Sequence, residues 1–83
     1  MTTPELGDPV AIYRFIDFIQ RTEKLWICRN RESGEWLGAV TYSSPWRQYI
    51  IRFNEYAEFS HDCLADIQDF LKKQNLKGKH DHA

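Results

Sequence analysis

Three strand-like runs in the middle of the chain constrain its fold more than any other feature of the sequence. They cover residues 24–30, 35–42 and 47–54, and only four residues separate each run from the next. Connections this short force neighbouring strands to run antiparallel, because a parallel pair needs a crossover of about a dozen residues or more. The first gap ends in Ser33-Gly34, which suits a tight hairpin turn. This segment therefore predicts a three-stranded antiparallel meander.

Two helices are predicted to flank the meander. Asp8-Pro9 is typical of a helix start, since aspartate caps free N–H groups and proline is tolerated at the first helical position. Apolar residues at helical spacing follow and predict a helix that ends near Thr22. They are Ile12, Phe15, Ile16 and Ile19. A second helix is predicted from Ser60, a good N-cap, to about Gln74.

The predicted order of elements is helix, three strands, helix. This is an α+β fold of two layers, α-β-β-β-α, with both helices packed on one face of the sheet. A chain of 83 residues has room for a single core, so residues 1–83 are expected to form one domain. The ordered part is predicted to span about residues 8–75, with flexible ends at 1–7 and 76–83.

The predicted strand pairing assigns the side chains to two faces, because successive residues of a strand point to opposite sides. With Ser33-Gly34 as a two-residue turn and Ser43–Trp46 as a four-residue loop, one face is expected to lie against the helices. It holds Leu25, Ile27, Trp36, Val40, Tyr42, Tyr49, Ile51 and Phe53. The outer face then carries Trp26, Cys28, Leu37, Ala39 and Ile50. A slip of one residue in the strand pairing would exchange the two faces. The alternative to an exposed outer face is that the chain itself covers both faces of its sheet.

The apolar character of this outer face indicates a binding surface. A sheet surface that faces water is normally mostly polar, and large exposed apolar patches mark interaction sites. The sequence therefore predicts a small non-catalytic protein-interaction module: a homodimer, an adaptor or an inhibitor. The predicted partner-binding residues are Trp26, Leu37 and Ile50 at the centre, with Arg52 and Trp46 at the edge.

A nucleic acid is the alternative partner. Arg29, Arg31, Arg47 and Arg52 lie among aromatic residues, a mixture that binds single strands. The predicted order of elements is similar to that of double-stranded-RNA-binding domains, which carry lysines at the start of their second helix. Here that place is taken by Phe59–Asp66, FSHDCLAD, whose acids would repel phosphate, so the resemblance covers topology alone. The net charge of −1 adds no support for nucleic acid.

No catalytic, cofactor or metal site is predicted. His61 and Cys63 are two residues apart, so on a helix they point about 200° apart and cannot converge on one substrate. His80 and His82 supply two ligands, whereas a zinc site needs about four. The motifs GxGxxG, GxxxxGK[ST] and GxSxG are absent from the sequence. We therefore expect neither an enzyme nor a small-molecule substrate.

The sequence also predicts a cytoplasmic protein. Its first ten residues have neither the basic nor the apolar segment of a secretion signal. No apolar run approaches the ~18 residues of a membrane span, so no membrane contact is expected. Cys28 and Cys63 are too few and too far apart in sequence for a disulfide framework, which favours reduced thiols.

Overall fold

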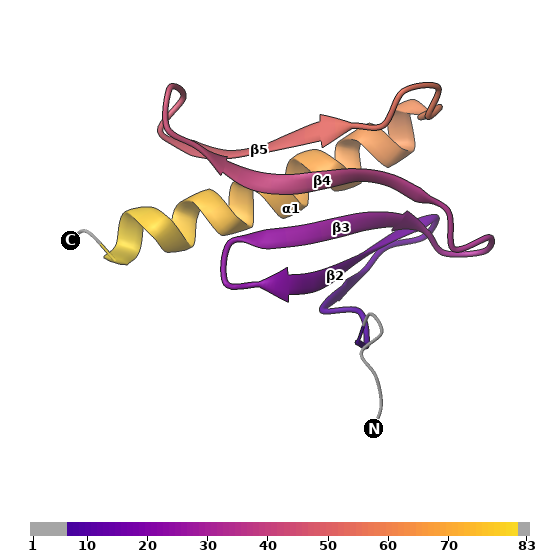
Figure 1. Cartoon of the computed structure of the whole chain (residues 1–83), viewed down its shortest axis with the longest axis horizontal. Helices are drawn as coiled ribbons and strands as arrows, with labels where there is room; N and C mark the ends of the chain where they lie inside the picture. Colours follow the sequence, from indigo (N-terminus) through magenta and orange to yellow (C-terminus); the bar gives the residue numbers. More distant parts are fainter. Residues whose placement is uncertain (1–6, 82–83) are drawn as a thin grey trace.

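The chain folds into one antiparallel sheet of five strands, in the order β1-β2-β3-β4-β5, followed by a single helix (Figure 1). The computed structural model describes residues 7–81, and the side chains of residues 7–77. The elements are β1 (Ala11–Ile12), β2 (Ile16–Thr22), β3 (Leu25–Asn30), β4 (Trp36–Ser43), β5 (Gln48–Phe53) and α1 (His61–Asp81). Strands that are neighbours in the sequence are also neighbours in the sheet.

The predicted fold was wrong in its N-terminal part. Residues 8–22 form β1 and β2 instead of a helix, so the structure is a five-stranded sheet with one helix, not a three-stranded meander with two. The reason is that β2 is buried on both sides: its first four residues, Ile16 to Ile19, are all buried. A strand covered on both faces has no clear alternation, and its apolar run imitates a helical stripe. The α+β class and the antiparallel sheet are confirmed.

Helix α1 begins where the sequence predicted it. The N–H of Cys63 donates to Oγ of Ser60 at 3.2 Å, so Ser60 is the N-cap, and Asp62 in the first turn suits the helix dipole. The helix continues to Asp81, beyond the predicted end at Gln74. Residues 1–6 and 82–83 of the predicted flexible ends lie outside the described residues. Within residues 7–81, no helix is both long and apolar enough to cross a membrane.

Aromatic side chains join the helix to the sheet. The ring of Phe70 on α1 stacks on Phe18 of β2, with centroids 3.9 Å apart and planes within 4°. Phe70 also meets Trp26 of β3 edge to face, at 5.7 Å and 78°. These rings centre the hydrophobic core. Its buried members are Ile16, Phe18, Trp26, Cys28, Leu37, Val40, Ile67 and Phe70.

A β-bulge at Leu37 decides which side chains reach that core. Near the β3–β4 hairpin, Arg29 pairs with Trp36. On the other side of Leu37, Cys28 pairs with Gly38, so β4 carries one extra residue at this point. Leu37 turns toward α1 and is only 6% exposed.

The bulge reverses the predicted assignment of the two faces of β3. Trp26 pairs with Val40, and Ile27 with Ala39, one residue away from the expected pairing. Trp26 and Cys28 therefore point to α1, while Leu25 and Ile27 point to the opposite face. The predicted faces were wrong for β3 because a single inserted residue exchanges the two sides of a strand.

The β3–β4 hairpin also differs from the predicted two-residue turn. Its loop has four residues, 31–34, because Asn30 and Glu35 close it: the N–H of Asn30 donates to the carbonyl of Glu35 at 2.8 Å. The N–H of Gly34 donates to the carbonyl of Asn30, also at 2.8 Å. Oδ1 of Asn30 accepts from the N–H groups of Glu32 and Ser33. Gly34 has φ +79°, a left-handed conformation that glycine adopts without strain.

Asn75 of α1 covers part of the open edge of β5. The N–H of Tyr49 donates to Oδ1 of Asn75 at 2.6 Å, and Nδ2 of Asn75 donates to the carbonyl of Tyr49 at 3.2 Å. The amide thus takes the place of a neighbouring strand for one residue of β5.

We expect Asn75→Ala to lower the free energy of unfolding by about 1–3 kcal/mol, because two part-buried backbone groups lose their partner. Urea denaturation followed by circular dichroism measures this change. Gln68→Ala, an exposed position on the same helix, is the matched control. Equal unfolding midpoints for the two variants would contradict the role given to Asn75.

Candidate functional site

The candidate site is the outer face, the side of the sheet opposite α1. In Figure 1 the helix lies behind the sheet, and within residues 7–81 it is the sole helix. Alternation from the core residues places Leu25, Ile27, Ala39, Ile50 and Arg52 on the outer face. Because the helical layer covers only one face of the sheet, the apolar side chains of the outer face are buried either by one another or by a partner.

A buried apolar strip crosses the middle of the outer face. Ile19 of β2 pairs with Ile27 of β3, and the two side chains are 0% and 6% exposed. Neither belongs to the core cluster under α1. The row continues through Ala39 to Arg52, which is exposed. The outer face is therefore apolar along its centre and cationic at one end of this row.

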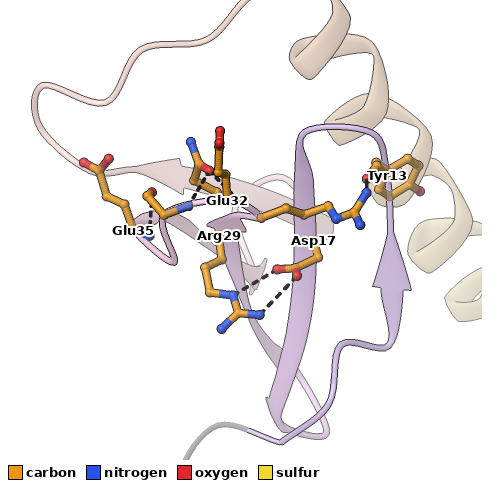
Figure 2. A network of polar contacts seen from close by, with 8 residues as sticks. Tyr13, Asp17, Arg29, Glu32 and Glu35 are labelled. Atoms are coloured by element: carbon orange, nitrogen blue, oxygen red, sulfur yellow. Dashed lines mark hydrogen bonds and ion pairs between the residues drawn. The ribbon is translucent and has the colours of Figure 1, made fainter.

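A bidentate ion pair borders the strip (Figure 2). Nε of Arg29 lies 3.1 Å from Oδ1 of Asp17, and Nη2 lies 3.1 Å from Oδ2. The residues are direct cross-strand partners, and the Asp17 side chain is 6% exposed against 26% for Arg29. The hydrogen bonds to Asp17 raise the pKa of Arg29. This fork holds the guanidinium in one orientation.

Trp36 extends the same row with an exposed aromatic ring. It pairs with Arg29 across β3 and β4, and its side chain is 45% exposed. The carbonyl of Trp36 accepts a hydrogen bond from Nδ2 of Asn54 at 2.7 Å, which fixes the backbone at this position. On β5, Arg52 lies two residues from the half-buried Ile50. We refer to Arg29, Trp36, Ile50 and Arg52 as the outer-face patch.

The five predicted partner-binding residues do not lie together. Trp26 and Leu37 are each 6% exposed and belong to the core beneath α1, so they cannot form the centre of an outer surface. Ile50 and Arg52 do lie on the outer face. Trp46 is 71% exposed in the β4–β5 hairpin, beyond the end of the strands.

The four arginines predicted for nucleic acid are also dispersed. Arg29 is held by Asp17, and Nη1 of Arg31 donates to the carbonyls of Tyr13 at 2.9 Å and Arg14 at 3.3 Å. Arg47 lies in the hairpin at the other end of β4, in a left-handed conformation with φ 56°. Of the four arginines, strand alternation therefore places two on the outer face, Arg29 and Arg52.

Sequence reasoning missed two residues of this surface, Trp36 and Asp17. Trp36 was expected against the helices, and only the bulge moves it to the outer face. Asp17 was expected on a helix. Only when residues 16–22 are taken as a strand does it follow that Asp17 and Phe18 point to opposite faces of the sheet, with Asp17 on the outer face.

Cys28 and His61 lie in different environments. Cys28 is buried, and burial is the main cause that raises its pKa to about 12, so its thiol stays protonated. His61 is exposed, and its Nε2 lies 3.4 Å from Oδ1 of Asp62. In the part of the chain that the structure describes, no group of three or more His, Cys, Asp and Glu side chains is placed to hold a metal ion. The side chain of His80 and all of His82 lie outside the described residues.

Comparison with known proteins adds no assignment. No protein-family model matches the chain, and no curated protein or solved structure is significantly similar to it.

Proposed function

We propose that the chain is a non-catalytic protein-interaction module that docks a partner protein on the outer-face patch. The observation that carries this proposal is the exposed Trp36 ring beside an Arg29 guanidinium already oriented by Asp17. Tryptophan and arginine are the residues that most often dominate protein interfaces. A side chain that is fixed before binding loses less conformational freedom on docking.

The outer-face patch favours a partner with an apolar contact for Trp36 and an acidic rim. Arg29 and Arg52 lie on this face by alternation, and the acid Asp17 is already paired with Arg29. Complementary charge suppresses wrong partners and speeds docking. Two copies joined through this face would bring their arginines together, so we favour an adaptor or an inhibitor over a homodimer. A cytoplasmic location, in which Cys28 and Cys63 stay reduced, belongs to the same proposal.

Affinity capture from the native host, with and without nuclease, tests this function. We expect one protein to be retained by the wild type after nuclease and to be lost with Trp36→Ala and with Arg52→Glu. Trp46→Ala is the matched control, because Trp46 is also exposed but lies in the hairpin. Cross-links from the retained protein to the outer face, involving its Asp or Glu residues, would support the acidic rim.

Two outcomes would overturn the proposal. Equal retention by the wild type, Trp36→Ala and Arg52→Glu would remove the outer-face patch from the interaction. Loss of all retained protein after nuclease, with steep weakening of binding in added salt, would indicate nucleic acid as the ligand.

A further inference from the structure

A groove with a volume of ≈ 660 Å³ separates β1 from the second half of α1. Its lining includes Trp26 and Phe70, which are only 6% and 2% exposed and meet edge to face. The base of the groove is therefore a rigid aromatic surface continuous with the core. This groove lies on the helix side of the sheet and is distinct from the outer-face patch.

The rim of the groove exposes apolar side chains on both sides. Val10 and Ile12, from the strand side, are 55% and 61% exposed. Leu76 faces them from α1 and is also 61% exposed. Single exposed apolar residues are ordinary, but here three surround one depression above an aromatic base, with the amides of Gln20 and Gln74 between them.

The helix side of the groove is cationic. Lys73 and Lys77 line it, while the acids Asp62 and Asp66 precede them in the first half of α1. Asp69 already has partners: Nζ of Lys73 lies 3.0 Å from Oδ2 of Asp69, which also accepts from the Tyr13 hydroxyl at 2.8 Å. Among the side chains of residues 7–77, none is an acid within ion-pair distance of Lys77, so we take Lys77 as the lysine that would meet an added negative charge.

We propose that this groove binds a small amphipathic anion, with an alkyl chain over Trp26 and Phe70 and an anionic head at Lys77. The volume is in the range of small-ligand sites, about 300–1,000 Å³, and an apolar base with a few polar groups is their usual composition. The proposal is for binding alone: the ionisable side chains that line the groove are Tyr13, Lys73 and Lys77, and the Tyr13 hydroxyl and the Lys73 ammonium are already engaged with Asp69.

Dodecanoate is the probe for this site. A Trp36→Phe/Trp46→Phe variant retains Trp26 as its one tryptophan, so its fluorescence reports on the base of the groove. We expect saturable quenching by a chain-brominated dodecanoate, and competition by dodecanoate itself. Dodecanol, which lacks the charge, should compete more weakly.

Matched variants locate the site. In the single-tryptophan background, Leu76→Asp should weaken binding at least about tenfold, because it removes apolar contact and adds a repelling charge. Lys77→Glu should weaken it about fivefold. Leu64→Asp and Lys72→Glu lie on the other side of α1, beside the smaller groove against β5, and should leave binding unchanged.

The experiment also separates a free ligand from a membrane. Phosphatidylglycerol vesicles, added in place of dodecanoate, should not co-sediment the protein if the groove takes free amphiphiles. If the protein co-sediments with the vesicles and Lys77→Glu abolishes this, the ligand of the groove is a membrane lipid headgroup, and the proposal of a free ligand is wrong. The proposal would be overturned if the brominated dodecanoate caused no saturable quenching. It would also be overturned if Leu76→Asp and Leu64→Asp weakened dodecanoate binding equally.

Discussion

Phe70→Ala should lower the free energy of unfolding by about 3–5 kcal/mol, the range for removing a buried aromatic ring. Phe70 is 2% exposed, stacks on Phe18 at 3.9 Å and meets Trp26 edge to face. The alanine loses both aromatic contacts and leaves a cavity between α1 and the sheet. Small domains have about 5–15 kcal/mol of stability in total, so this loss is a large part of it.

Urea denaturation followed by far-ultraviolet circular dichroism measures the effect. Phe15→Ala is the matched control, since Phe15 is 44% exposed, and it should cost less than about 1 kcal/mol. If the variant does not fold at all, the milder Phe70→Leu should still be less stable than the wild type. A Phe70→Ala protein with the wild-type midpoint would show that α1 does not pack on the sheet through this ring.

Gly38→Ala is expected to have the second largest effect, a loss of about 2–3 kcal/mol, the upper part of the range for forcing extra atoms into a packed site. A Cβ at Gly38 would lie 2.7 Å from the carbonyl oxygen of Arg52 and 3.3 Å from Cα of Phe53. Both contacts are with the backbone of β5, so no side chain can move aside to relieve them. β4 and β5 would have to separate beside the bulge.

Amide hydrogen exchange gives a local measure of this separation, in addition to the unfolding midpoint. Exchange should accelerate most in β5 around Arg52 and Phe53, which lie against Gly38. Gly7→Ala is the control, because nothing lies within 4 Å of a Cβ added there. Unchanged protection in β5 together with an unchanged midpoint would contradict the close approach of the two strands.

The sequence predicted the second half of the fold better than the first. β3, β4 and β5 lie where apolar runs between turn residues were found, and Ser60 marks the start of α1, because these signals are local. The helix over residues 8–22 failed for a non-local reason. Residues 16–19 of β2 are buried on both faces, and a two-residue β1 has too little sequence to show alternation.

The candidate surface depended on information that the sequence does not show. One extra residue at Leu37 sends Trp26 to the core and Trp36 to the outer face. No residue type marks such a bulge with certainty, although Gly38, next to it, is required by the close approach of β5. Ile50 and Arg52 were placed on the correct face although β4 and β5 pair two residues away from the expected register, with Val40 opposite Ile51 instead of Tyr49, because a shift of two residues leaves each side chain on the same face.

The two edges of the sheet have a consequence for the behaviour of the protein at high concentration. Exposed edge strands act as templates on which further chains polymerise into fibrils. At one edge, β1 offers only two residues, and at the other the Asn75 amide occupies the main chain of Tyr49. Addition of a further strand is therefore obstructed at Tyr49, and undocking of α1 would open the whole of β5 to intermolecular cross-β pairing.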